Sequence, residues 1–313
     1  MISYISRRIG AGLVLIACAS FIVFALMLAN SENVARNILG DEASLAQLAA
    51  KKVELGLDNP LLLQYGQWLF NAVQGNLGKS WFNAESVGYL LLNRIPVTLS
   101  IAVGTVVAST LVSLIMGVAA AVYRGWLDRV LQIVSVVGLV FPGFWLALVM
   151  IVKVSIEWGL VPATGYITFA QSPFGWMQSL LLPVFSLAIG AVAGLSQQVR
   201  SATIGVLEMD FVRTLRSRGL SETSVLFRHV LRNAAPPTLT VLSLNFIGLM
   251  SGAVMIEQVF ALPGLGSIAV EATGVGDIPI VVGAVVISVV IVVIVNLVID
   301  LINGWLNPKV RLS

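Results

Sequence analysis

The sequence predicts an all-α membrane protein with six transmembrane helices. Of its 313 residues, 58% are hydrophobic and 11% are charged, whereas a soluble domain carries about 25% charged residues. Six apolar stretches each reach about 20 residues, the length that crosses a hydrocarbon core of ~30 Å. Runs such as Val281–Val295 do not alternate between polar and apolar residues, as the strands of a membrane barrel would.

The apolar stretches separate an N-terminus (1–8), a segment between the first two spans (30–96), a loop between the fourth and fifth (200–235) and a tail (304–313). The expected spans are Ile9–Ala29, Val97–Val122, Val130–Ser155, Leu180–Val199, Pro237–Phe260 and Ile280–Asn303. Arg and Lys occur in the 200–235 loop and at both termini but not in Trp158–Ser179 or Ala261–Pro279. Because cytoplasmic loops are enriched in these residues, both termini and the 200–235 loop are predicted to be cytoplasmic.

The 30–96 segment is expected to form a small subdomain outside the membrane. Within it, Leu61–Val73 could be a surface helix with Trp68 and Phe70 at the membrane interface. Gly78-Lys79-Ser80 resembles the end of a phosphate-binding loop, but Val73 stands where that loop needs its first glycine. Any ATP must therefore be bound by another chain. The single Cys and single His exclude an intrachain disulfide and a multi-His metal site.

Few polar residues lie inside the expected spans. Pro142-Gly143 should kink or break the third span. Two Gly-x-x-x-Gly motifs, Gly190–Gly194 and Gly248–Gly252, suit close helix packing or the approach of a partner subunit. The candidates for the pore or a subunit interface are Asn245, Gly248, Gly252, Glu257 and Gln258. No span holds paired carboxylates or a catalytic cluster, so the chain is predicted not to be an enzyme, and an ion-coupled secondary transporter is disfavoured.

The loop at residues 200–235 is long for a mere connection. Its apolar spacing predicts a helix over Ile204–Ser217, a break at Gly219 and a second helix over Glu222–Asn233. Ser221 is placed to cap the second helix, and Pro236-Pro237 to end it. A basic hairpin of this kind could lie on anionic lipid headgroups or dock a soluble partner, and composition leaves both open.

The residues of this loop resemble the EAA loop of ABC importer permeases of the dipeptide/oligopeptide/nickel class. The resemblance rests on Phe211–Glu222 followed by Arg228–Ala234, and it extends over nearly the whole chain. Further matching motifs are Leu55–Pro60, Gly75–Ser80, Arg94–Leu99, Trp126–Arg129, Phe141–Leu146, Leu160–Tyr166, Glu257–Gly266, Asn296–Asp300 and Asn307–Arg311. Departures are Asn30-Ser31-Glu32 after the first span, the bulky Leu215, and Ala235-Pro236-Pro237.

The resemblance implies a type I permease fold, with a core at about 95–308, in a bacterial cytoplasmic membrane. A second homologous permease, one or two kinds of cytoplasmic ABC ATPase and an outer solute-binding protein would complete the importer. This chain would bind no cofactor, while its ATPase partners use ATP and Mg. The implied cargo is di- or oligopeptides, with nickel chelates, glutathione or another small solute as alternatives.

The same resemblance divides the loop into two sets of residues. The first set would couple to the ATPase: Asp210, Phe211, Arg213, Arg216, Arg218, Gly219, Leu220, Ser221 and Glu222. The second set would brace the loop against the ends of the chain's own helices: Arg228, His229, Arg232 and Asn233.

Overall fold

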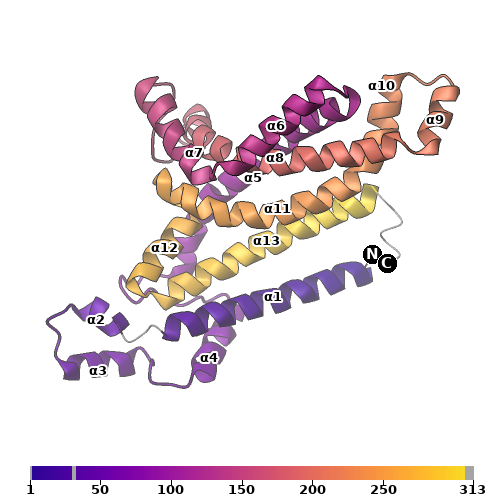
Figure 1. The fold of residues 1–313 in the computed structure, drawn as a ribbon. Helices are drawn as coiled ribbons and strands as arrows, with labels where there is room; N and C mark the ends of the chain where they lie inside the picture. The colour runs from indigo at the N-terminus through magenta and orange to yellow at the C-terminus, as the bar shows by residue number, and fades with distance from the viewer. Residues whose placement is uncertain (1, 30–32, 307–313) are drawn as a thin grey trace. The chain divides into compact units, whose positions relative to one another are not determined.

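A computed structural model describes residues 2–29 and 33–306, and its regular structure is almost entirely helical (Figure 1). Within these residues five helices are long and apolar enough to cross a membrane, and a bent helix pair raises the number to as many as six. The predicted all-α membrane fold is therefore confirmed. Two features of the sequence, Asn30–Glu32 and the basic tail residues Lys309 and Arg311, lie outside the described residues.

The long helices extend beyond most of the expected spans. They are α1 (Ile2–Ala29), α5 (Val87–Val122), α8 (Pro173–Leu207), α11 (Leu231–Val259) and α13 (Ile278–Leu306). In α8 the hydroxyl of Ser172 accepts the backbone N–H of Gly175 at 3.0 Å, and Pro173 follows at the first helical position. Both residues favour a helix start, which explains why α8 begins seven residues before the expected Leu180.

The chain divides into two compact units. The first contains Met1–Ile5, Leu99–Leu262 and Ile294–Ser313, and the second contains Ser6–Thr98 and Pro263–Val293. In the first unit α8 is the central helix, because it contacts α6 (Trp126–Val140), α7 (Gly143–Met150) and α11. A cluster of apolar residues seals the contact between α8, α11 and the end of α13; its buried members are Leu195, Val199, Leu242 and Ile299.

The expected third span is broken at Pro142. Helix α6 ends at Val140, and α7 begins at Gly143 and continues into a π-helix, η2 (Ile151–Glu157). The segment Gly143–Glu157 is bent by 93° relative to α6. Phe141 has extended dihedrals, φ −86° and ψ 122°. A residue before proline is pushed out of the helical region, so the Phe141-Pro142 step ends one helix and lets the next begin. Of the two outcomes expected at Pro142-Gly143, a kink or a break, the structure shows the break.

The prediction that Pro236-Pro237 ends the second loop helix is wrong. The helix of that loop passes from α10 (Glu222–Ser224) through a π-helical turn, η3 (Val225–Val230), into α11, with both prolines inside α11. Proline removes one N–H and frees the carbonyl four residues earlier, here those of Arg232 and Asn233. Both residues are exposed, so the freed carbonyls can remain solvated.

In the second unit, the turn between α12 (Leu265–Val275) and α13 anchors the 30–96 segment. The hydroxyl of Ser80 donates to the carboxylate of Asp277 at 2.5 Å, and the side chain of Asn37 donates to the carbonyl of Val275 at 2.9 Å. Asp277 is buried, and this burial raises the pKa of its carboxyl, although hydrogen bonds such as that from Ser80 oppose the rise. Gly78-Lys79-Ser80 is thus a structural loop, with Ser80 as its anchor.

The rest of the 30–96 segment forms short helices in the second unit. These are α2 (Val34–Leu39), α3 (Leu45–Glu54) and α4 (Leu61–Val73). A capping box between Ser44 and Gln47 starts α3. Helix α4 packs its Tyr65 and Trp68 rings against Phe24 of α1, so Trp68 faces protein, whereas Phe70 is 70% exposed.

Candidate functional site

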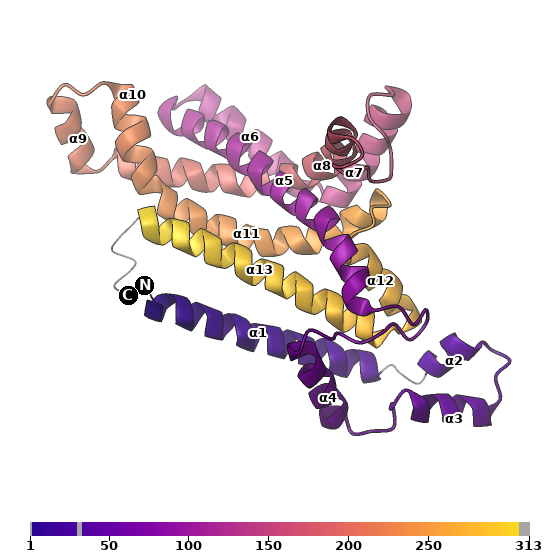
Figure 2. The ribbon, with the colours of Figure 1, turned by 180° about the vertical axis from the view of Figure 1, so that it is seen from behind.

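The 200–235 loop projects as a hairpin of α9 (Asp210–Ser217) and α10 beyond the ends of α8 and α11 (Figures 1 and 2). Its first helix is shorter than expected, because α8 runs on through Leu207 and the chain breaks at Glu208-Met209. Gly219 makes the turn with φ +80°, in the left-handed region that favours glycine. Ser221 then caps α10 by accepting the backbone N–H of Ser224 at 3.4 Å, as expected.

A small apolar core holds this hairpin to the helices on either side. Its buried members come from α8, α9, η3 and α11, and they are Val206, Val212, Val225, Val230 and Ala234. Leu215 and Leu220 pack against this core. Because the core joins all these elements, the hairpin cannot move without moving the ends of α8 and α11.

The buried residue of α9 is Val212, which the sequence analysis did not single out. The apolar pattern counted from Ile204 ran across the break at Glu208-Met209, so it included Phe211 and Leu215 but not Val212. Counted within α9 alone, Val212 and Leu215 share one face at a spacing of three. Phe211 is 37% exposed, so its ring is accessible to a partner at the surface of the hairpin.

The three arginines predicted to meet the ATPase differ in their surroundings. Arg216 forms a two-pronged ion pair with Glu222 across the turn, at 2.8 and 3.0 Å. Arg213 is 75% exposed and has only a weak contact with Asp210, at 3.5 Å. Arg218 is exposed and has no side-chain partner among the described residues. Arg216 therefore stiffens the hairpin, while Arg213 and Arg218 remain available to a partner.

A groove of about 670 Å³ runs beside the hairpin. Charged residues of both signs line it, with two aromatic rings at its edge: Tyr123, Arg124, Glu208, Arg213, Arg216, Glu222 and Phe227. Arg124 donates to Glu208 at 2.9 Å, which ties the turn after α5 to the break after α8. Such a mixed-charge surface suits a protein segment better than a single anion.

The four residues predicted to brace the loop are largely turned outward. Arg228 and Arg232 are exposed and make no side-chain hydrogen bond or ion pair within the described part of the chain. The amide of Asn233 donates to the carbonyl of His229 at 2.8 Å, a contact within one helix. The bracing that the structure does show comes from Arg216–Glu222 and Arg124–Glu208.

A second charge contact lies deeper, between α6 and α8. Arg200 donates from Nε and Nη2 to the two carboxylate oxygens of Asp128, both at 2.6 Å. Gln132 donates to the same carboxylate at 2.8 Å, and Ser135 and Ser196 share a hydrogen bond one turn further along, at 3.0 Å. A bidentate pair adds geometric specificity to the attraction between charges. These hydrogen bonds therefore determine how α6 packs against α8. Asp128 belongs to the Trp126–Arg129 motif, which predicted no role for it.

The pore and interface candidates on α11 do not share one environment. Glu257 is fully buried, so within this chain it does not line an open path. A Cβ on Gly252 would lie 3.0 Å from Leu187 of α8, whereas Gly248 faces open space. Gln258 is exposed and Asn245 half-buried. Gly252 therefore serves packing within the chain, while Gly248 and Gln258 remain candidates for contact beyond it.

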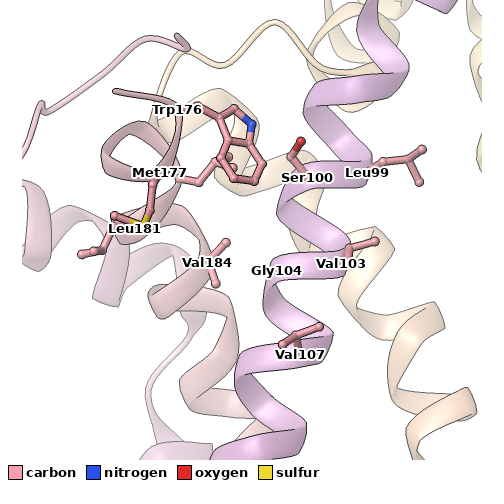
Figure 3. Close-up of a pocket in the computed structure, with 10 residues that line it drawn as sticks. Leu99, Ser100, Val103, Gly104, Val107, Trp176, Met177, Leu181 and Val184 are labelled. Atoms are coloured by element: carbon pink, nitrogen blue, oxygen red, sulfur yellow. The ribbon is translucent and has the colours of Figure 1, made fainter. Parts of the chain in front are cut away.

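An open apolar cavity of about 550 Å³ lies between α5 and α8 (Figure 3). Its walls are almost entirely aliphatic and aromatic, and its lining includes Leu99, Val103, Val107, Trp176, Met177 and Val184. The indole of Trp176 already donates to the hydroxyl of Tyr166 at 3.1 Å. With no charged group in its lining, this cavity cannot recognise the charged ends of a polar solute. The described residues also hold no cluster of three or more His, Cys, Asp or Glu that could bind a metal.

Comparisons with known proteins agree over the whole chain. Residues 95–312 match the family described as "Binding-protein-dependent transport system inner membrane component", and residues 1–102 match the N-terminal part of such components. A "Putative peptide transport system permease protein" of Brucella abortus (strain 2308) is 37% identical over 312 residues, 99% of each chain. The "Glutathione transport system permease protein GsiC" of Escherichia coli (strain K12) is 32% identical over 312 residues, again 99% of each chain.

A solved structure shares the fold at lower sequence identity. A chain of the inward-facing MetNI methionine ABC transporter matches with a TM-score of 0.57 and 20% identity, over 70% of this chain and 97% of that one. At this identity the match speaks for the fold alone.

Proposed function

Since the chain belongs to the binding-protein-dependent inner membrane components, the non-catalytic permease subunits of ABC importers, we propose that its cargo is di- or oligopeptides. The names of its relatives support this cargo, because one is described for peptides and another for glutathione, itself a tripeptide. Family membership also excludes the ion-coupled secondary transporter that composition had left open.

The partners follow in part from the family and in part from this proposal. Permeases of this family work with ABC ATPases and binding proteins and bind no cofactor themselves. For this chain we add a second homologous permease as the other half of the pore, with one or two kinds of ATPase beneath it. The distribution of Lys and Arg supports cytoplasmic termini and a cytoplasmic 200–235 loop.

The observation that carries the mechanism is the apolar core of the hairpin. Val212 on α9 is buried in one cluster with Val206 of α8 and Ala234 of α11. A partner that grips Phe211 and Arg213 would therefore pull on two transmembrane helices together. Closure of an ATPase dimer would thereby become a rigid-body change of the pore, provided the partner contacts the two states differently.

Two substitutions test this lever. Phe211→Asp places a charge at the exposed ring position, and Gly219→Leu forces a bulky side chain into a left-handed conformation at φ +80°, which costs roughly 1–2 kcal/mol. Both should lower substrate-stimulated ATP hydrolysis by the reconstituted importer without removing the protein from the membrane. Gly205→Ala is the matched control, since that helical glycine has open space around it. Unaltered stimulation in both variants would overturn the coupling role.

Transport assays test the cargo separately. Uptake of labelled di- and tripeptides into proteoliposomes should require the binding protein and ATP. Nickel chelates and other small solutes are tested in the same assay. If the importer takes these solutes up while peptides neither bind to the binding protein nor compete for uptake, the proposed peptide cargo is wrong, although the family assignment stands.

A further inference from the structure

The helix α4 belongs to the 30–96 segment, which the sequence places outside the membrane, yet it is attached to the middle of a transmembrane helix. The hydroxyl of Tyr65 donates to the carbonyl of Ala17 at 3.1 Å and shares a hydrogen bond with Ser20 at 2.9 Å. Both α1 and α4 lie in the same compact unit, and they lie side by side in both ribbon views (Figures 1 and 2).

The depth of this contact follows from the position of Ala17 in α1. The apolar part of α1 runs over Ser6–Ala29. At 1.5 Å per residue, Ala17 lies about 17 Å from its start and about 18 Å from its end. Because the hydrocarbon core is ~30 Å thick, Ala17 is near the midplane whichever way the helix points.

The aromatic contacts place the body of α4 in one leaflet. The Tyr65 ring meets Phe21 edge-on at 5.2 Å and Phe24 at 5.7 Å between centroids, and the Trp68 ring lies 6.3 Å from Phe24. On α1, Phe21 and Phe24 are about 12 and 8 Å inside the Ala29 end. These rings therefore sit below the headgroups, in the leaflet that holds Ala29.

The exposed residues of α4 are mainly apolar and uncharged, with Gln67 and Asn71 as the polar exceptions. The helix Leu61–Val73 contains no charged residue. Leu62 is 73% exposed, Phe70 70% and Val73 81%. Helix α3 offers the contrast, since its exposed Val53 is next to Lys52 and Glu54, and Lys51 pairs with Glu54 at 2.7 Å.

We propose that α4 is embedded in the bilayer beside α1 and that Leu62, Phe70 and Val73 contact lipid acyl chains. An unpaired apolar face at this depth meets hydrocarbon. Tyr65 is hydrogen-bonded to α1 at this depth, as a membrane interior without water requires, whereas the indole N–H of Trp68 is buried and has no hydrogen-bond partner among the described residues. The segment 30–96 is therefore partly a membrane element, and α4 widens the lipid-facing surface of the second unit.

Spin labels on single cysteines test this proposal in the complete importer in lipid nanodiscs. The background needs one change, Cys18→Ala, because Cys18 is the only cysteine. Labels at Leu62→Cys, Phe70→Cys and Val73→Cys are compared by their collision rates with oxygen, which dissolves in lipid, and with a water-soluble nickel chelate. Leu26→Cys on α1, at a position 63% exposed, is the lipid-facing reference, and Val53→Cys on α3 is the water-facing one.

The proposal expects the three α4 labels to match Leu26, with oxygen collisions exceeding those of the nickel chelate several-fold. If they match Val53 instead, α4 lies in water and the proposal is wrong. If both relaxants are excluded, a protein surface such as the second permease covers α4, and the lipid contact is equally wrong. A label on native Cys18, one residue from the Tyr65 contact and exposed, needs no substitution and checks the depth of α1 in the wild-type chain. A Cys18 label that collides freely with the nickel chelate would place that level of α1 in water, which also overturns the proposal.

Discussion

The ion pair between Asp128 and Arg200 should stabilise the packing of α6 against α8, and Asp128→Asn should weaken that packing. The guanidinium would lose a carboxylate that accepts two bonds of 2.6 Å. The side chain of Asp128 is 12% exposed and that of Arg200 26%, so the pair is neither fully buried nor at the surface. Exposed pairs contribute about 0–1 kcal/mol and breaking a buried pair costs about 3–5; we expect about 2–3 kcal/mol here.

Hydrogen exchange followed by mass spectrometry measures this loosening locally. A loss of 2–3 kcal/mol against local opening corresponds to roughly 30- to 160-fold faster exchange of amides in α6 and the facing part of α8. Glu222→Gln is the comparison, because it breaks the exposed pair with Arg216, whose side chains are 42% and 71% exposed. That variant should change exchange in the hairpin by less than about fivefold.

A charge exchange separates the ion pair from mere loss of a side chain. The double variant Asp128→Arg with Arg200→Asp should recover part of the protection that either single variant loses. If D128N exchanges like wild type, or if the two single effects simply add in the double variant, the pair does not fasten α6 to α8 and the reasoning fails.

Three further predictions concern packing, capping and pH. Gly117→Ala should lower the Tm of the purified complex, because the added Cβ would lie 2.7 Å from the carbonyl oxygen of Ser196 and such overpacking costs about 1–3 kcal/mol. Gly205→Ala should instead raise the Tm, because that glycine has open space around it. Equal Tm changes in the two variants would contradict the packing at Gly117. Ser221→Ala should cost about 1 kcal/mol by removing the cap of α10, seen as faster hydrogen exchange in the hairpin alone. Burial raises the pKa of Asp277 above its ordinary 3.8. The carboxyl's contribution to stability is therefore complete below pH 3.8 and is lost as the pH rises through the folded pKa. Over this pH range the Tm should fall less in Asp277→Asn than in the wild type, and parallel curves of Tm against pH for the two proteins would contradict the raised pKa.

The amino-acid pattern was sufficient for the fold class and the family because both depend on long-range composition and on motif order. Six apolar stretches require helices in lipid, and the motifs from Leu55–Pro60 to Asn296–Asp300 recur along the whole chain. The break at Pro142 was also readable, because proline and its preceding residue restrict the backbone locally.

Contacts between distant residues were not readable from one sequence. Whether Arg216 meets an ATPase or Glu222 depends on the turn at Gly219, and whether Glu257 faces a pore or the protein interior depends on the rotation of α11. The prolines at 236 and 237 misled because local rules treat them as helix ends, whereas exposure at Arg232 and Asn233 leaves the freed carbonyls accessible. The attachment of α4 to Ala17 joins residues 48 positions apart, a separation that no periodicity encodes.

The central proposal is that an ATPase subunit binds this permease at the α9–α10 hairpin. A photo-crosslinking amino acid in place of Phe211, the exposed ring of α9, tests it directly in the assembled importer. Phe169 is the control, since it is 61% exposed in the loop before α8, at the other end of that helix from the hairpin. We expect irradiation to join position 211, but not position 169, to an ATPase subunit. Adducts from position 211 to lipid alone, or equal ATPase adducts from both positions, would contradict the claim.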